Sequence, residues 1–215
     1  MQPIAAQSHL RYPLTRLLAN GGAVRVLRSL CLFGGPLSVS QLAQETSMTP
    51  QGVRLALNAL VGQQVISVLG QGRATLYELD IRHPLALSLK TLFADEQSQW
   101  ENLMRDLRAT VGKLKDVEAA WYYGSVARGE DLPNSDMDIA IVVTVDPEAA
   151  TDALREALRE IERTYAVTCS VIGVALADVR EMAQGNAWWQ EMARDAKVLK
   201  GMLPDRLVQR QRKAA

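Results

Sequence analysis

Residues 118–145 read EAAWYYGSVARGEDLPNSDMDIAIVVTV, and this stretch decides the fold of the C-terminal half. Its pattern predicts a strand over 119–123, a sharp turn at Gly124 and Ser125 that leads into a short helix, and a second strand over 136–143. Because side chains alternate between the two faces of a strand, Asp136 and Asp138 should lie on one face, about 7 Å apart. The apolar residues that alternate with them should take the other face.

Two carboxylates so placed can share a hard divalent cation, Mg²⁺ or Mn²⁺, which typically binds one or two carboxylates together with substrate phosphates. The turn supplies the complementary half of a site. Gly124 lets the backbone approach a phosphate closely, Ser125 carries a hydroxyl, and the start of the next helix offers free N–H groups. The stretch therefore predicts that phosphates lie between the turn and the metal ions, as in polymerase-type in-line transfer.

A strand, Gly-Ser, ten intervening residues and Asp-x-Asp opening an apolar strand resemble the signature of the nucleotidyltransferase superfamily, which includes DNA polymerase beta and kanamycin nucleotidyltransferase. The segment GSVARGEDLPNSDMDIAIVV is similar to the minimal bacterial branch, with Arg128 and Ser135 also at matched positions. The resemblance implies a nucleoside triphosphate as ligand or substrate. It implies Asp136 and Asp138 as catalytic metal ligands, and it implies nucleotide contacts from Gly124, Ser125, Arg128 and Ser135.

The match breaks at one position. Family enzymes carry a third carboxylate on a later strand, which here is most naturally AVTCSVIGV, and that segment contains no acid. Alignment of the following helix places the position at Ser170, with Cys169 and Thr168 as register alternatives. Glu130 or Asp131 could substitute for the missing acid. Without it, we expect nucleotide binding to survive better than catalysis.

The N-terminal half has the pattern of a winged helix-turn-helix. Apolar residues at helical spacing predict a first helix from Gly22 that stops at 34–36, followed by two further helices within 38–64. Ser38 or Ser40 can cap the second helix, and Thr49 with the following proline can begin the third. The segment VISVLGQGRATLYELD, over 65–80, then predicts a hairpin that forms the wing. The whole resembles winged-helix regulators over about residues 20–82.

In such a motif the third helix enters the major groove and the wing approaches the backbone. The side chains placed to reach DNA are Thr49, Gln51, Arg54, Asn58 and Arg73. Arginine can pair with guanine or neutralise a phosphate, and glutamine or asparagine suits adenine. A third helix with one arginine is lightly charged, however, and winged helices also serve as protein-protein modules.

The predicted organisation is a winged helix-turn-helix over 1–83, a linker helix over 84–117, a nucleotidyltransferase-fold domain over 118–203 and a frayed basic tail over 204–215. An apolar stripe on the linker helix, including Leu89, Phe93, Trp100 and Leu103, could pair two copies into a homodimer or pack on its own domains. The four tryptophans are expected to be core or interface residues. Tyr122 and Tyr123 flank the Gly-Ser turn, so one of them could line the nucleotide pocket.

Composition supports this organisation. Residues 1–90 carry eight Lys/Arg against three Asp/Glu and residues 91–215 carry sixteen against twenty-one, so a polyanion is expected to meet the first half. Chance variation between two solvated surfaces is the alternative. Cys31 and Cys169 lie in apolar stretches and are expected to be free thiols, and the lack of any long apolar run indicates a cytoplasmic protein with no membrane segment.

The sequence therefore predicts an α+β protein that binds double-stranded DNA as a transcriptional regulator and carries a Mg-nucleotide-binding domain with weakened or lost catalysis. The fused arrangement also resembles a group of prokaryotic regulators. The alternative is an active nucleotidyltransferase that transfers a nucleoside monophosphate to a hydroxyl of a partner protein, as in antitoxins of the minimal branch, or of a small molecule. A third interpretation is a pair of modules that bind only other proteins.

Overall fold

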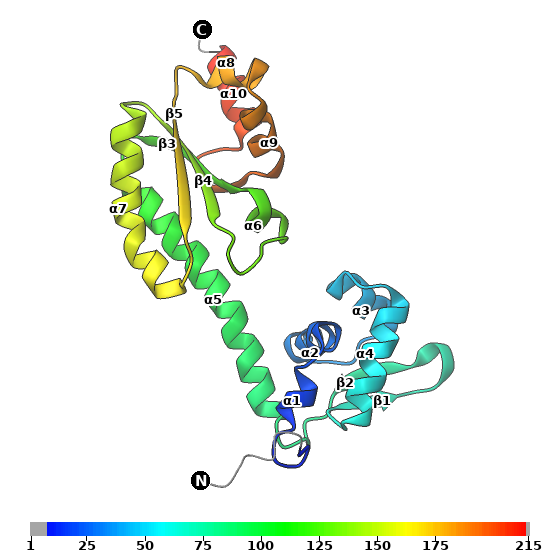
Figure 1. Ribbon diagram of the computed structural model, residues 1–215. Coiled ribbons are helices and arrows are strands. Elements are labelled where there is room, and N and C mark those ends of the chain that lie inside the picture. The colour runs from blue at the N-terminus through cyan, green and yellow to red at the C-terminus, as the bar shows by residue number, and fades with distance from the viewer. Residues whose placement is uncertain (1–7, 214–215) are drawn as a thin grey trace, which may run out of the picture. The chain divides into compact units, whose positions relative to one another are not determined.

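The computed structural model describes residues 8–213, which divide into two compact units, the first ending at Ser98 and the second beginning at Gln99. The protein is α+β, as the sequence predicts (Figure 1). In the described residues no helix is both long and apolar enough to cross a membrane. Cys31 and Cys169 are both free thiols, as expected.

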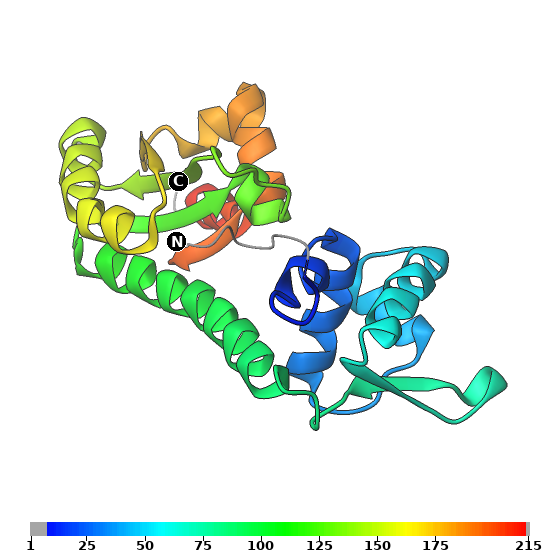
Figure 2. The same cartoon turned by 60° about the horizontal axis from the view of Figure 1, so that its bottom comes forward.

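The first unit has the element order of a winged helix-turn-helix. Its elements are α1 (Leu14–Leu17), α2 (Gly21–Phe33), α3 (Val39–Thr46), α4 (Pro50–Gly62), β1 (Ile66–Leu69), the 3₁₀ turn η1 (Gly72–Ala74), β2 (Leu76–Leu79) and the first part of α5 (Ala86–Lys113). The antiparallel hairpin of β1 and β2 projects from the helices, with η1 between the two strands (Figure 2). A bridge between Leu37 and Tyr77 joins the hairpin to the segment before α3.

Local signals explain the tight turn between α3 and α4. The Ser38 side chain accepts from the backbone N–H of Gln41, and the Gln41 side chain accepts in return, so the capping box begins α3. The helix ends at Ser47, which adopts the left-handed conformation with φ of 50°. Thr49 then caps α4 through the N–H of Gly52. Ser38, rather than Ser40, is therefore the cap of α3.

The second unit is built on a mixed four-stranded sheet in the order β5-β4-β3-β6. Its elements are β3 (Val117–Tyr123), α6 (Gly124–Arg128), β4 (Met137–Val143), α7 (Pro147–Tyr165), β5 (Cys169–Ala175), α8 (Val179–Gly185), α9 (Ala187–Asp195), β6 (Lys197–Lys200) and α10 (Pro204–Lys213). Strand β3 is antiparallel to β4 and β6, and β4 is parallel to β5. One face packs against α7 and the C-terminal part of α5, and the other against α8, α9 and α10 (Figure 1).

One expectation about the chain was wrong. The segment after residue 203 is not frayed: it forms α10, whose Leu207 and Val208 are buried in the core and whose Arg210 donates to Glu118 at 2.5 Å. The apolar stripe on α5 packs mostly within the cores of its own two units, which is one of the two alternatives given for it. Leu89 and Phe93 belong to the core of the first unit. Leu103 belongs to the core of the second, and Trp100 alone of the four stays exposed, at 43%.

The packing of α7 on β5 generates a stability prediction. A Cβ added at Gly173 would lie 2.8 Å from the carbonyl oxygen of Pro147 and would overlap Thr151 Oγ1, both on α7. The proline carbonyl belongs to the backbone and cannot relieve the overlap by a side-chain rotation. We therefore expect Gly173→Ala to lower the free energy of unfolding by about 1–3 kcal/mol. Chemical denaturation measures this change.

The matched control is Gly112→Ala in α5, where an added Cβ meets nothing within 4 Å. Alanine favours the helix over glycine, so this variant should gain about 0.5–1 kcal/mol. Equal stability of the two variants would contradict the close contact between α7 and β5.

Candidate functional site

The turn after β3 brings the chain against a carboxylate. Gly124 has φ of 74°, in the left-handed region that glycine tolerates best, and it begins α6 directly after Tyr123. A Cβ at Gly124 would lie 2.7 Å from Oδ2 of Asp138. The backbone and the carboxylate therefore approach each other as closely as they do only because residue 124 has no side chain.

Strand register places Asp138 in the middle of a row. It pairs with Tyr123 on β3 and with Ser170 on β5, so these three side chains share one face of the sheet. Asp138 is half-buried, whereas Asp136 is exposed and lies just before β4, which begins at Met137 rather than at the predicted residue 136. Asp138 thus lies within the strand, and Asp136 lies just before its first residue.

The two carboxylates lie close enough for the charge of one to act on the other. Burial raises the pKa of Asp138 above its ordinary value, and the neighbouring Asp136 raises it further. Within residues 8–213, no lysine or arginine forms an ion pair with either acid. Two unpaired acids beside a side-chain-free turn fit a divalent cation with phosphate ligands, because such a cation supplies the missing positive charge.

A third acidic ligand is missing from this row. Among the described residues there is no group of three or more His, Cys, Asp or Glu side chains placed to hold a metal ion. The register puts Ser170, the preferred alignment, beside Asp138. Cys169 pairs with Met137 instead, and burial, followed by the charges of Glu162 and Asp136, raises the pKa of its thiol to about 12. The thiol therefore stays protonated at neutral pH and is a poor metal ligand.

The loop between α6 and β4 is held by its own polar residues. Arg128 donates to Glu130 at 2.8 Å and to Asp195 at 2.5 Å, which ties the end of α6 to the end of α9. Its pKa is raised by these two hydrogen bonds. Ser135 accepts from the N–H of Leu132 at 2.9 Å and closes the loop before Asp136. Arg128 and Ser135 therefore hold the loop in place, and Glu130, a suggested substitute for the missing acid, is engaged by Arg128.

The two tyrosines before the turn take opposite faces. Tyr122 meets Trp100 edge-on and packs on the α5 and α7 side. Tyr123 lies on the Asp138 side, where its hydroxyl accepts from Nε1 of Trp188 at 3.2 Å. Burial raises the pKa of Tyr123, the Trp188 hydrogen bond lowers it, and the charge of Asp138 raises it again. Tyr123 is therefore the tyrosine that borders the site.

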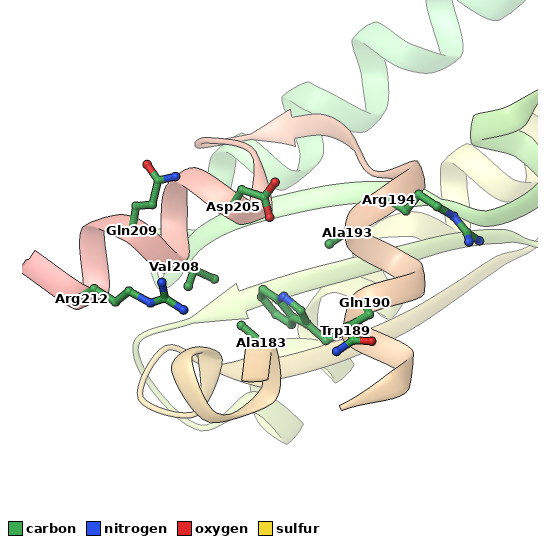
Figure 3. A pocket seen from close by; sticks show the side chains of 9 residues that line it. All are labelled: Ala183, Trp189, Gln190, Ala193, Arg194, Asp205, Val208, Gln209 and Arg212. Carbon is green, nitrogen blue, oxygen red and sulfur yellow. The ribbon is translucent and has the colours of Figure 1, made fainter. Parts of the chain in front are cut away.

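A hollow between α9 and α10 shares no residue with the predicted site (Figure 3). It is lined by Ala183, Trp189, Gln190, Ala193, Arg194, Asp205, Val208, Gln209 and Arg212. The ring of Trp189 extends from α9 toward Val208 of α10, and only 3% of this residue is exposed (Figure 3). Trp121, which is fully buried, contacts the same ring edge-on. These two tryptophans are core residues, as expected.

In the first unit, the predicted DNA-contacting residues of α4 lie on the side of the helix that faces away from the core. Gln51, Arg54 and Asn58 are exposed, and the opposite side buries Val53, Ala56, Leu57 and Leu60 in the core. Thr49 is exposed and caps the helix. Arg73 lies in η1 at the tip of the hairpin, and its side chain is outside the described part of the structure. Leu55, which was not among the predicted DNA-contacting residues, is 63% exposed and lies among these polar side chains. The helical period alone would have placed it there.

The comparisons with known proteins identify the fold of the second unit. Residues 105–184 match the family described as Polymerase beta, Nucleotidyltransferase. Residues 105–184 of the second unit therefore have the nucleotidyltransferase fold. The match includes β3, α6, β4, α7 and β5, and so contains every element that positions the two carboxylates. A comparison with curated proteins found no match.

Solved structures resemble this chain only in part. The AntR antimony-specific transcriptional repressor is 24% identical over 47% of this chain and 89% of its own, with a TM-score of 0.38. A toxin-antitoxin structure with AMP-PNP is 17% identical over 54% and 84%, with a TM-score of 0.34. Human N-acetylserotonin methyltransferase in complex with SAM is 21% identical over 50% and 37%, with a TM-score of 0.24.

The raised pKa of Asp138 predicts that the stability of the protein changes with pH. Because its pKa is raised in the folded protein, folding favours the protonated form, and stability falls as pH rises from about its ordinary value of 3.8 through the raised pKa. Asparagine cannot ionise. Without divalent cations, Asp138→Asn should therefore be more stable than the wild type at neutral pH and should lose that advantage below about pH 3.8.

Denaturation in a chelator at several pH values measures this difference. Asp131→Asn, in the exposed loop, is the control and should show no such pH-dependent gain. A destabilised Asp138→Asn protein at neutral pH would contradict the assignment of an unpaired, desolvated carboxylate.

Proposed function

We propose that this chain is a DNA-binding transcriptional regulator whose C-terminal domain binds a nucleoside triphosphate with Mg²⁺ or Mn²⁺, with transferase activity weakened or lost. One observation carries the nucleotide half of the proposal. Asp136 and Asp138 have no cationic partner among the described residues, and Asp138 lies against the bare backbone of Gly124. A divalent cation bound to phosphate oxygens would supply the positive charge that this pair of acids lacks.

In the proposed site, the two acids bind the metal ion and the Gly-Ser turn contacts the phosphates. Asp136 and Asp138 would ligate the metal ion, which when bound neutralises triphosphate oxygens and links them to the protein. Gly124 leaves room for a phosphate beside the backbone, and the Ser125 hydroxyl can donate to it. Arg128 and Ser135, which hold the intervening loop, would keep Asp136 in position and could contact the nucleotide from there.

The serine beside Asp138 argues for binding above catalysis. A carboxylate at this place would help to remove the proton from an attacking hydroxyl, a contribution of about 10²- to 10⁴-fold in rate. Ser170 supplies neither the charge nor the base. Glu130, already paired with Arg128, is a poor replacement. The alternative, an active enzyme that modifies a partner protein or a small molecule, is favoured only by the retained Asp136, Asp138 and Gly124.

The DNA half of the proposal rests on the outward side of α4. Gln51, Arg54 and Asn58 form a polar face on a helix that is capped by Thr49 and begins after a tight turn, as a groove-reading helix does. The hairpin carries Arg73 at its tip. The excess of basic residues over residues 1–90 is consistent with a polyanionic partner. Binding to paired half-sites as a homodimer, and a place in the cytoplasm, belong to the same proposal.

The nucleotide site is tested with α-labelled nucleoside triphosphates and Mg²⁺. We expect the wild-type protein to retain label non-covalently, and Asp136→Asn to lose it, because one carboxylate no longer carries charge. Restoring the missing acid with Ser170→Asp should raise covalent transfer to protein in a cell lysate by about 10²- to 10⁴-fold over the wild type.

Ser170→Asn, similar in size but uncharged, is the matched control and should behave as the wild type does. Nucleotide retention that is unchanged in Asp136→Asn would show that the site is wrongly placed. Efficient transfer by the wild type would support the active enzyme, and retention without transfer would support the regulator.

The DNA face is tested with duplexes selected from a random-sequence library. Arg54→Ala should weaken binding about tenfold or more, since an arginine paired with a base is worth about 1–3 kcal/mol, and the double variant with Arg73→Ala should weaken it further. If either arginine meets phosphate instead, the slope of affinity against salt should fall by about one.

Arg16→Ala, on α1, removes an exposed positive charge away from α4 and is the control. Equal affinity of the double variant and the wild type would contradict the groove assignment. Absence of any selected duplex would favour the protein-protein module.

A further inference from the structure

Trp188 differs from the other tryptophans of the second unit. Trp121 and Trp189 are buried to 0% and 3% exposure, and Trp100 lies on the opposite face of the sheet against Tyr122. Trp188 is only partly buried and lies beside Tyr123, the tyrosine next to Asp138. Trp121 and Trp189 are members of the core, whereas Trp188 packs against that core and keeps part of its indole exposed.

The position of Trp188 is set from several sides. Its ring meets Tyr123 edge-on, with centroids 6.0 Å apart and planes at 83°, and its Nε1 donates to the Tyr123 hydroxyl at 3.2 Å. On its other side it contacts Trp189 at 6.4 Å, and Trp189 contacts the buried Trp121 at 6.0 Å. Four aromatic rings thus form a chain from the core of the second unit to the edge of the site.

Helix α9, which carries Trp188, is capped at its start and tied to α6 at its end. At its start the Asn186 side chain caps it by accepting from the N–H of Trp189. At its end Asp195 accepts from Arg128, the last residue of α6, the helix that follows the Gly-Ser turn. The indole is therefore held beside the row of Tyr123, Asp138 and Ser170 with little freedom left to lose on binding.

We propose that Tyr123 and Trp188 form the wall that receives the nucleobase, with Trp188 as the stacking platform, while Asp136 and Asp138 hold the metal-bound phosphates. This inference rests on the proposed nucleotide site and names the part of the ligand that its metal end leaves unassigned. A nucleotide whose phosphates meet Asp138 carries its base toward the neighbouring side chains. A rigid aromatic ring there supplies stacking energy with little entropic loss.

The hydrogen bond from Trp188 to Tyr123 gives the tyrosine a second part in the wall. Because the Tyr123 hydroxyl accepts the indole N–H, the polar edge of the tryptophan is satisfied within the protein and needs no partner from the ligand. Tyr123 is thus a positioning residue for the platform, and Trp188 is the residue that would touch the base.

Two ligands separate the base from the phosphates. Mg-ATP carries a base, and Mg-tripolyphosphate carries only the phosphates, so we would titrate both into the full chain by calorimetry. Trp188→Ala should weaken Mg-ATP about tenfold or more and leave Mg-tripolyphosphate unchanged, because loss of a stacking partner affects only the base. Trp188→Phe keeps a ring and should lose less affinity for Mg-ATP.

Trp100→Ala is the matched control, since Trp100 is also a partly exposed tryptophan that meets a tyrosine of β3 edge-on, at 6.2 Å, but on the opposite face. It should leave both affinities unchanged. Tryptophan fluorescence adds an independent signal: ATP should quench the wild type and Trp100→Phe, and quenching should be largely lost in Trp188→Phe. Thermal unfolding of each variant confirms that it is folded.

Each outcome decides between the proposals. Equal loss of both ligands in folded Trp188→Ala, or no loss of either, would overturn the base platform while leaving the metal and phosphate site intact. Failure of the wild type to bind either ligand would instead overturn the nucleotide site, and the platform with it. Loss confined to Mg-ATP is the result that the proposed wall requires.

Discussion

The close approach of the Asp138 carboxylate to the backbone of Gly124 is the constraint around which the second unit is arranged. It requires a residue without a side chain at the end of β3, and it requires that β3 and β4 pair in the one register that brings Tyr123 opposite Asp138. The parallel pairing of β4 with β5 then decides that residue 170 is the third neighbour. A shift of one residue in either pairing would turn a different set of side chains toward the site.

The same constraint has an electrostatic side. The sheet half-buries Asp138 close to a second acid, and neither acid forms an ion pair with a basic side chain among the described residues. A protein selected only for stability would replace one of the two. Their retention, next to a turn that leaves space at the backbone, is the pattern expected where an absent ligand supplies the balancing charge.

The positions that the sequence predicted well share one property: their signal is local. Strand alternation placed Asp136 and Asp138, the Gly-Ser pair placed the turn, and Thr49 with its proline placed the start of α4. Asp136 fell one residue outside β4, since the ends of elements depend on hydrogen bonds that alternation does not report. The alignment that chose Ser170 depended on a helix downstream, and the strand register gives the same neighbour.

Contacts between distant segments were beyond local pattern. The pairing of Arg128 with Asp195 joins residues 67 positions apart, and Trp188 meets Tyr123 across 65 positions. The basic composition of 204–215 suggested a solvated tail, whereas Leu207 and Val208, three and four residues after a helix-starting proline, are buried in the core. The stripe on α5 was recognised, but its partners could not be, because helical spacing shows that a face is apolar and not what covers it.

Helix α5 serves both units, since Leu89 and Phe93 lie in one core and Leu103 and Leu107 in the other. No loop separates the modules, so a gene rearrangement that exchanges one of them must cut within the helix. An insertion or deletion of one residue at the junction would rotate one set of core side chains by about 100° relative to the other. Such a change would leave the contacts within each core in place, because each core takes its residues from its own part of the helix.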